Sequence, residues 1–399
     1  MNNDIALAPW RGDPEISKSL IDKILFIENL EKAFKKSQKG KSKYTKEAIE
    51  FAMDEVYNLL QLKLSIINGT YKFSGYINFT ITHPKVRDIN APHYVDKIVQ
   101  LAINNVLKEI YQPKFIYDTY ACLDDKGTHA CVKRIYYFMR KAKWEYGDSA
   151  TIVKIDIKKF FYTIVREVLK DLIARTIKDK KVLELIYLII DSADEIDILG
   201  MPLGNTISQL CANIYLNEID QYAKRSLSLR YYIRYADDIV AIVENKERAK
   251  EVLELIRVRV ETKLQLKLNE NKSKTFPIAQ GVNAIGFKIY PTHMLLRNDS
   301  KKRIKRKLRK FRPMLIEEKI SIEKVEQILN SWHGHAEQAN VYGFVQSLLK
   351  RFDYIKLVNK KSKKGKLKKV FKIKKEVIED ARKAYISANE QREMGIVCA

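Results

Sequence analysis

An acidic pair, Asp237-Asp238, stands between two short runs of aromatic and β-branched residues. Tyr231-Tyr232-Ile233 precedes the pair and Ile239-Val240-Ala241 follows it. Runs of this composition are typical of strands, so residues 231–243 are predicted to form a β-hairpin with the acids at its tip. An ordinary turn is one explanation, because Asp is a common turn residue. Carboxylates between strands of core composition are costly without a purpose, and this favours a functional site.

A third acid, Asp156, lies at the end of the apolar run 150–157, which is predicted to be a buried strand. If that strand neighbours the hairpin in one sheet, three carboxylates converge and raise one another's pKa. Divalent cations between them would relieve the repulsion, and carboxylate oxygens suit Mg²⁺. Two ions about 3.5–4 Å apart can clamp the attacking and leaving oxygens of a phosphoryl displacement. We therefore expect Asp156, Asp237 and Asp238 to bind two Mg²⁺ ions, with Mn²⁺ as an alternative.

The charge of the chain indicates a polyanionic partner. The 399 residues carry a formal net charge of +25, an excess that folding does not require. Nucleic acid is the commonest such partner, although a merely basic protein, such as a ribosome-associated factor, has a similar composition. A hydrophobic fraction of 46% argues against disorder of the whole chain.

The cysteines and apolar segments predict a protein of the reducing cytoplasm. None of the four cysteines forms a Cys-x-x-Cys pair, so neither a zinc ribbon nor a disulfide framework is expected. Residues 1–10 lack a basic start followed by an apolar run, so no signal peptide is expected. The apolar run at residues 183–190 is too short to span a bilayer, and no membrane contact is expected.

Hydrophobic periodicity divides the chain into helical and strand-like parts. Residues 1–75 are predicted to be mostly helical, and residues 77–90 strand-like. Helices are predicted at residues 94–110, 160–178, 206–227 and 248–266, and a short hairpin-like stretch at 282–297. Eight of the ten residues 301–310 are Lys or Arg on a helical period. Residues 356–375 contain eleven lysines and no acid, and we expect either a solvated tail or a nucleic-acid contact.

Two of these segments resemble motifs of the reverse transcriptase family. Tyr235-Ala236-Asp237-Asp238 is similar to its Y-x-D-D box, and residues 154–161 are similar to its first palm motif. The resemblance implies that Asp156 and Asp237 bind both metals, that Asp238 assists, and that Tyr235 lies beside the primer. It also implies that Phe161 is an aromatic gate that excludes a 2′-hydroxyl and so selects deoxynucleotides. Without the motif, Phe161 would be interpreted as a core residue.

Further motifs occur in the family's order. Residues 84–89 are similar to the fingers motif in which Lys85 and Arg87 hold the triphosphate, and residues two apart on a strand face the same side. Their charges suit phosphate oxygens. Lys274 resembles the family's later lysine motif, or is only a surface lysine. Gly286-Phe287, after Ile285, resembles the primer grip that seats the 3′ end.

The second palm motif departs from the common form. Many reverse transcriptases have Gln-Gly and then Ser-Pro, whereas this chain has Leu203-Gly204-Asn205-Thr206-Ile207-Ser208-Gln209. This form resembles that of diversity-generating retroelements, and phage-defence reverse transcriptases share many of the motifs. The resemblance implies that Leu203, Gly204 and Gln209 line the nucleotide site. A leucine cannot hydrogen-bond the nucleotide as a glutamine amide could, so relaxed base selection is a hypothesis. For His333 and His335, two residues apart with no cysteine pair nearby, helix-end packing or template contact is favoured over a metal site.

The resemblance implies an α+β right-hand polymerase with fingers, palm and thumb. The expected parts are a helical N-terminal extension at 1–76, fingers and palm at 77–297, a basic helical thumb at 298–352 and a lysine-rich tail at 353–399. Lys301, Arg303 and Arg306 of the thumb are expected to contact primer and template.

The implied function is that of an RNA-directed DNA polymerase, bacterial or phage-encoded, in a diversity-generating retroelement or an antiphage defence system. One alternative is a defence-associated polymerase that needs no external template or uses a protein primer. Another is a non-catalytic RNA-binding scaffold, against which the intact acids argue. The expected partners are an RNA template or non-coding RNA, a DNA primer or product, dNTPs and a protein partner subunit.

Overall fold

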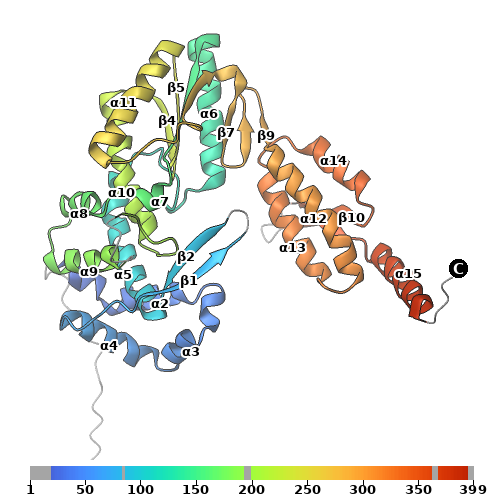
Figure 1. Cartoon of the computed structure of the whole chain (residues 1–399), viewed down its shortest axis with the longest axis horizontal. Helices are drawn as coiled ribbons and strands as arrows, with labels where there is room; N and C mark the ends of the chain where they lie inside the picture. Colours follow the sequence, from blue (N-terminus) through green and yellow to red (C-terminus); the bar gives the residue numbers. More distant parts are fainter. Residues whose placement is uncertain (1–18, 83–85, 193–198, 362–366, 394–399) are drawn as a thin grey trace, which may run out of the picture. The chain divides into compact units, whose positions relative to one another are not determined.

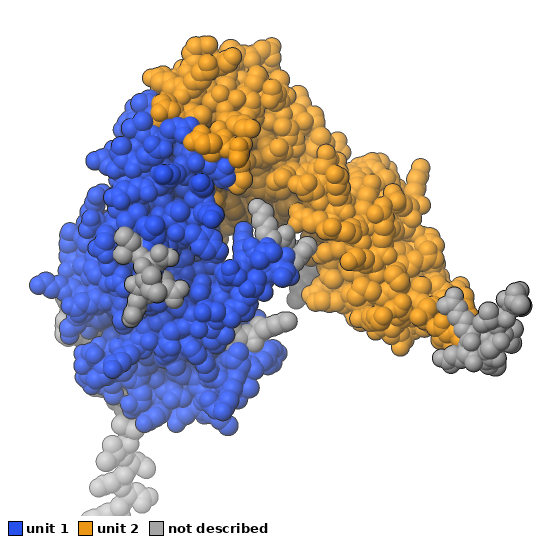
Figure 2. Space-filling view, in the orientation of Figure 1, with its two compact units in different colours: residues 1–122, 156–228, 255–269 blue, residues 123–155, 229–254, 270–399 orange. Residues whose placement is uncertain are grey.

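The computed structural model describes residues 19–82, 86–192, 199–361 and 367–393 of the chain. These residues form two compact units, coloured blue and orange in Figure 2. Unit 1 takes in Met1–Cys122, Asp156–Ser228 and Leu255–Asn269, and unit 2 takes in Leu123–Ile155, Leu229–Glu254 and Glu270–Ala399. Each unit is therefore assembled from three stretches that alternate along the chain.

Unit 1 is mainly helical and is organised around α5 (Tyr94–Tyr111). Apolar residues recur on several sides of this helix, so it is buried against α1 (Leu20–Ile24), α2 (Ile27–Ser37) and α10 (Ser208–Gln221). The other helices of unit 1 are α3 (Lys46–Met53), α4 (Glu55–Ile67), α7 (Phe160–Thr163), α8 (Arg166–Ala174) and α9 (Lys180–Asp191), with short helical turns at Lys41–Tyr44, Gln112–Lys114 and Tyr222–Ser226.

Unit 1 also contains a two-stranded antiparallel ribbon. β1 (Tyr76–Ile81) pairs with β2 (Arg87–Pro92), with Tyr76 opposite Pro92 and Ile81 opposite Arg87. Most residues of the ribbon are exposed or half-buried, whereas Asn90 of β2 donates its backbone N–H to the carbonyl of Leu203 at 2.6 Å. This bond ties the ribbon to the loop before α10.

Unit 2 is built on a four-stranded sheet with the order β4-β5-β3-β6. Its strands are β3 (Thr151–Asp156), β4 (Tyr231–Tyr235), β5 (Asp238–Val243) and β6 (Lys274–Pro277). β3 lies between two other strands, and its apolar residues Ile152, Val153 and Ile155 are all fully buried, which explains its unbroken apolar sequence. Helix α6 (Thr128–Tyr146) packs along β4 and β5 (Figure 1). Helix α11 (Lys246–Leu264) contributes residues to both units.

The rest of unit 2 comprises a small sheet and a mainly helical C-terminal part. The small sheet has the order β7 (Val282–Ala284), β8 (Phe287–Ile289) and β9 (Met294–Leu296). The elements after it are α12 (Asn298–Ile316), α13 (Ile322–Ala336), α14 (Tyr342–Arg351), β10 (Ile355–Lys361), β11 (Leu367–Ile373) and α15 (Lys375–Glu393). Short helical turns occur at Gly147–Ser149 and Ile278–Gln280. The lysine-rich segment thus forms an antiparallel hairpin and a helix in its described part.

Many predicted elements are confirmed, including the hairpin at 231–243 and the helices at 94–110 and 248–266. The single helix predicted for 160–178 is wrong, because α7 and α8 are separated at Val165, which makes a β-bridge with Leu199. The hairpin-like stretch at 282–297 has a third strand. In the described ranges, none of the helices is both long and apolar enough to cross a membrane. In the described part of the chain, Cys122, Cys131 and Cys211 form no disulfide; Cys131 and Cys211 are buried and Cys122 is exposed.

Candidate active site

The hairpin β4–β5 presents the acidic pair as the sequence predicts. Tyr235, the last residue of β4, lies opposite Asp238, the first residue of β5, and Ala236 and Asp237 form the turn between them. Ala236 has φ of +53°, a left-handed conformation that non-glycine residues rarely adopt. The buried guanidinium of Arg234 donates to the carbonyl of Ala236 at 3.1 Å and holds this turn. Backbone strain that is held in place by neighbouring groups often occurs at functional sites.

The strand β3 carries the third acid and neighbours β5 in the same sheet. Asp156 is the last residue of β3 and is 6% exposed. Two residues earlier, the Nζ of Lys154 lies 3.6 Å from Oδ1 of Asp238 and donates to the carbonyl of Asn283 at 2.6 Å. Residues two apart on a strand face the same side, so Lys154 marks the face on which Asp156 lies.

The acids match the donors that Mg²⁺ prefers, although they do not form a complete cage. Within the described ranges, no three His, Cys, Asp or Glu residues are grouped so that they could hold a metal ion. Mg²⁺ is commonly held by one or two carboxylates together with substrate phosphates and waters. Asp237 and Asp238 at one hairpin tip fit that class, and the Lys154 ammonium offsets part of the charge of Asp238.

A second group of predicted residues comes together in unit 1 through backbone hydrogen bonds. Met201 donates to the carbonyl of Phe161 at 2.7 Å, which fastens the loop before α10 to α7. The Asn90–Leu203 bond fastens the same loop to β2. Gly204 has φ of +115°, and a Cβ on it would lie 2.8 Å from Cγ2 of Ile89. The gate, second palm and fingers motifs are therefore joined at this loop.

The side chains of this group differ in exposure. Phe160 is 3% exposed, whereas Phe161 is half-buried, so Phe160 and not Phe161 is the core residue of the pair. Leu203 is half-buried, and Arg87 at the start of β2 and Gln209 on α10 are exposed. Lys85 lies outside the described residues.

Lys274, the candidate of the later lysine motif, begins β6 in unit 2. It lies opposite Lys154 in the register of β3 and β6, and it is exposed. The structure therefore places Lys274 beside the lysine that contacts Asp238. Burial and the nearby charge of Lys154 lower the pKa of Lys288, so several lysines gather on this side of unit 2.

The primer-grip motif forms the turn between β7 and β8 and packs on α13. Gly286 has φ of +87°, and a Cβ on it would lie 3.1 Å from Nε2 of His335. The ring of Phe287, which is fully buried, has its centroid 4.5 Å from that of His335. Burial lowers the pKa of His335, and the nearby His129 and Arg303 lower it further. His333, the other histidine of the pair, packs against Phe371 with ring centroids 5.1 Å apart.

Sequence reasoning did not assign roles to two residues at the start of α6. The hydroxyls of Thr128 and Tyr235 are 3.2 Å apart, which connects α6 to the hairpin. His129 lies 5.8 Å from His335 between ring centroids. These contacts join residues more than 100 positions apart, and a local pattern carries no signal for them.

Helix α12 carries the predicted thumb residues Lys301, Arg303 and Arg306. The buried residues of this helix are Ile304, Leu308, Phe311 and Leu315. Arg303 and Arg306 are exposed, and the ammonium of Lys301 lies 5.6 Å from the ring centroid of Phe344. The exposed side of α12 is therefore strongly basic.

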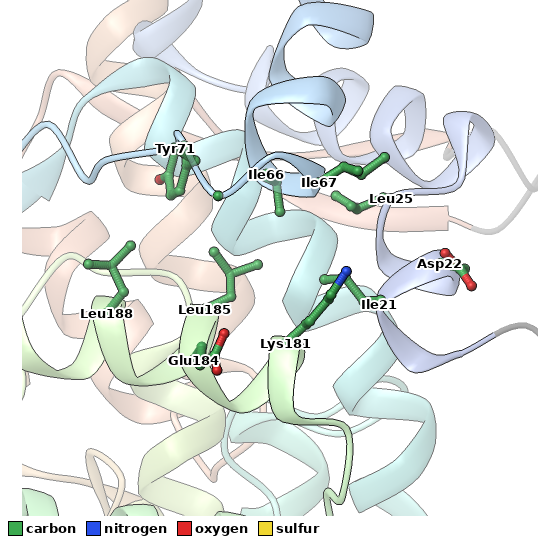
Figure 3. A pocket seen from close by; sticks show the side chains of 11 residues that line it. Ile21, Asp22, Leu25, Ile66, Ile67, Tyr71, Lys181, Glu184, Leu185 and Leu188 are labelled. Carbon is green, nitrogen blue, oxygen red and sulfur yellow. The ribbon is translucent and has the colours of Figure 1, made fainter.

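A pocket of about 410 Å³ in unit 1 was not predicted. It lies among α1, the end of α4 and α9 (Figure 3). Its lining includes the apolar residues Ile21, Leu25 and Leu185 and the charged residues Lys181 and Glu184 of α9. None of the predicted site residues lines it.

Residues 81–289 match the family model described as reverse transcriptase (RNA-dependent DNA polymerase). The chain belongs to the reverse transcriptase family. The matched range covers more than half of this reverse transcriptase and contains Asp156, Asp237 and Asp238. The α+β right-hand polymerase class expected from the motifs is confirmed.

Several curated proteins are similar to this reverse transcriptase. It is 24% identical over 364 residues to the group II intron-encoded protein LtrA of Lactococcus lactis subsp. cremoris, an alignment that covers 71% of this chain and 59% of the relative. It is 26% identical over 261 residues to protein YkfC of Escherichia coli K12, which covers 54% of this chain and 65% of the relative. The chain thus spans less than two thirds of the length of these relatives.

Among solved structures, apo telomerase from Candida tropicalis truncated from its C-terminal domain has a TM-score of 0.45 at 14% identity, covering 61% of this chain and 60% of that one.

Proposed function

We propose that this chain is an RNA-directed DNA polymerase that makes cDNA by nucleotidyl transfer at Asp156, Asp237 and Asp238. The observation that carries the proposal is the sheet order, in which the strand ending in Asp156 neighbours the strand beginning with Asp238. The match of residues 81–289 to the reverse transcriptase family model supports it.

The three carboxylates would hold divalent cations, Mg²⁺ or Mn²⁺, together with the nucleotide phosphates, and the cations would supply stabilisation of charge in the phosphoryl displacement. Lys154 keeps Asp238 in place through its contact at 3.6 Å. It also limits the repulsion between the two acids of the hairpin, because its positive charge lies beside them.

The loop before α10 would form the nucleotide side of the site. Phe161 would pack on the incoming sugar and exclude a 2′-hydroxyl, and Arg87, with Lys85, would bind the triphosphate. The backbone bonds that join α7, the loop and β2 support a common role for Phe161, Leu203 and Gly204. Gln209 and Lys274, both exposed, would contact the nucleotide from α10 and β6.

The primer and template would lie against unit 2. Tyr235 and the Gly286-Phe287 turn would seat the primer end, and Lys301, Arg303 and Arg306 of α12 would bind the phosphate backbone. Each such contact with a duplex would add about 0.9 to the slope of log affinity against log salt, so binding is expected to weaken steeply with salt.

A double substitution at the hairpin tests the assignment. Asp237→Asn with Asp238→Asn removes two charges with little change of shape, and we expect incorporation of deoxynucleotides to fall by at least about 100-fold while RNA binding is retained. Asp148→Asn, at an exposed acid that is 92% accessible in the same unit, is the matched control. Incorporation by the double variant at the wild-type rate would show that the site assignment is wrong.

The template supplied in the same primer-extension assay separates the activities. Incorporation that needs RNA supports the proposal, and incorporation without a template, or onto the protein itself, indicates a template-independent or protein-primed polymerase. RNA binding by the wild type without any incorporation indicates a scaffold.

We further propose that the enzyme serves a diversity-generating retroelement or an antiphage defence system, with a protein subunit as an additional partner. The second palm motif supports this, because its leucine at position 203 offers no amide to the nucleotide. Leu203→Gln is expected to lower the misincorporation rate in primer extension. An ordinary error rate in the wild type would remove the hypothesis of relaxed base selection.

A further inference from the structure

The antiparallel hairpin of β10 and β11, here called the lysine ribbon, carries an unusual concentration of one charge. The described residues 356–361 and 367–375 include eight lysines and no acid. In the described part of the ribbon, Lys356, Lys360, Lys368 and Lys369 are all exposed. The helix that follows, α15, has mixed charges, as is usual for a solvated helix.

The pairing of the two strands places lysines directly opposite one another. Lys356 pairs with Lys372 and Lys360 pairs with Lys368. Cβ atoms of directly opposite residues are about 5 Å apart, and like charges in this position destabilise a hairpin. The two pairs are four residues apart along the strands, or about 13 Å. An arrangement that weakens the fold is readily explained if an anion lies over it.

The two lysine pairs differ in their acidic partners. The pair Lys356–Lys372 is here called the inner pair, and the pair Lys360–Lys368 the outer pair. Lys356 lies 4.0 Å from Glu376, and Lys372 lies 2.5 Å from Glu326. Within the part of the chain that the structure describes, Lys360 and Lys368 have no acid within salt-bridge distance. The outer pair is therefore the one whose charge is left for a ligand.

The ribbon is held in place on α13 by contacts that do not involve Lys360 or Lys368. Asn330 accepts the N–H of Phe371 at 2.7 Å and donates to the carbonyl of Phe371 at 3.0 Å. Glu326 accepts the N–H of Ile373 at 3.0 Å. Phe371 and Ile373 are buried, β11 packs along α13, and β11 pairs with β10. Lysines on a fixed support lose less entropy when they bind a regular array of charges.

We propose that the lysine ribbon is a second nucleic-acid-binding surface that holds the phosphate backbone of an RNA, apart from the contacts of α12. An RNA suits it because a nucleic acid carries closely spaced charges of one sign, and the opposed Lys360 and Lys368 present two closely spaced charges of the opposite sign. Ile355, Phe371 and Ile373 of the ribbon are buried, and Leu367 is its one large apolar side chain that is mostly exposed, so a membrane surface is less suited. The choice of RNA over DNA rests on the proposed function.

The test removes the charge of the outer pair. Lys360→Gln with Lys368→Gln is compared with Lys319→Gln and Lys383→Gln, which remove two charges at exposed sites elsewhere in unit 2. Affinity for an RNA duplex, single-stranded RNA and a DNA duplex is measured across a salt series. If both lysines contact phosphates, the slope of log affinity against log salt falls by about 1.8 for a duplex or about 1.4 for a single strand. At about 0.1 M salt these slopes correspond to about 60-fold and about 25-fold weaker binding than the wild type.

The outcomes separate this inference from the proposed function. A ribbon variant whose slope equals that of the control variant would overturn the inference, and so would a change seen with the DNA duplex alone. Vesicles of anionic lipid that bind the wild type but not the ribbon variant, with RNA binding unaltered, would assign the ribbon to a membrane. If the slope falls as expected but the wild type incorporates no deoxynucleotide, the ribbon stands and the proposed polymerase does not.

Unfolding and turnover complete the test. The ribbon variant is expected to unfold at the wild-type temperature or above it, because an opposed pair of like charges has been removed. On a short primer and template its turnover is expected to match the wild type. Loss of RNA binding accompanied by a lower unfolding temperature would indicate a structural role for these lysines and overturn the inference.

Discussion

Gly204 is a position at which the structure predicts a large effect from one added carbon. Its φ of +115° is unfavourable for any residue with a side chain. A Cβ there would lie 2.8 Å from Cγ2 of Ile89 and 3.0 Å from the carbonyl oxygen of Asn90. Both neighbours belong to β2, whose Asn90 donates to Leu203 at 2.6 Å. Gly204→Ala must therefore push the loop and the ribbon β1–β2 apart.

Two costs add in this variant. The backbone conformation costs about 1–3 kcal/mol in the free energy of unfolding. The contact with β2 must also be relieved by movement, and a displacement of about 1 Å near reacting groups can reduce a rate by about 100-fold. We therefore expect kcat/KM for deoxynucleotides to fall by up to about 100-fold, measured by steady-state primer extension. Thermal unfolding of the same sample gives the loss of stability.

Gly75→Ala separates strain from contact. Gly75 has φ of +97° and belongs to the same unit, but a Cβ there would meet no atom within 4 Å. It should lose stability through backbone strain alone and keep its kcat/KM within a few-fold of the wild type. Equal kinetic losses in the two variants would refute the argument that packing between Gly204 and β2 positions the nucleotide site.

Three further predictions concern α13. His335→Ala removes the ring that lies 4.5 Å from Phe287 and should raise KM for the primer more than it lowers kcat in primer extension; a change in kcat alone would contradict this. Because the pKa of His335 is lowered from 6.5, the folded state binds this proton less tightly than the unfolded chain. The contribution of His335 to the free energy of unfolding is present above pH 6.5 and is lost as the pH falls through 6.5 toward the lowered pKa. In urea unfolding, acidification should therefore reduce the free energy of unfolding less for His335→Gln than for the wild type. Asn330→Ala removes the side chain that bonds both the N–H and the carbonyl of Phe371 and should lower the free energy of unfolding by about 1–3 kcal/mol. Hydrogen exchange at the Phe371 amide should become faster, and unchanged exchange would show that these hydrogen bonds do not hold the lysine ribbon.

The sequence predicts well those features that depend on neighbours in the chain. The hairpin at 231–243 follows from its β-branched and aromatic residues, and the acids fall at its tip because polar residues interrupt the run. The break between α7 and α8 was missed, because Val165 is drawn from the helix by a bridge to Leu199, 34 residues away. Propensity alone cannot show such a partner.

The site was predicted in part for the same reason. The sequence does not reveal which strands are neighbours, so it predicts a cluster of acids only if β3 and the hairpin share a sheet. The sheet order shows that β3 and β5 are neighbours. The role of His335 depends on Gly286 and His129 approaching from other elements. Composition predicts either a solvated tail or a nucleic-acid contact for the lysine-rich segment. It does not reveal the hairpin, because the packing of Ile355, Phe371 and Ile373 depends on helices from elsewhere in the chain.

The alternation of the two units along the chain constrains how the protein is made. Unit 1 needs Leu255–Asn269, and unit 2 needs Leu123–Ile155, so neither can be completed from one uninterrupted segment. During synthesis, the N-terminal part must wait for residue 269 before its last stretch is available. Contacts between such distant segments slow folding and expose apolar surface meanwhile. Expression of either unit as a fragment cut at a single position is therefore expected to give an insoluble product, and dissection of this protein is better done by point substitution within the whole chain.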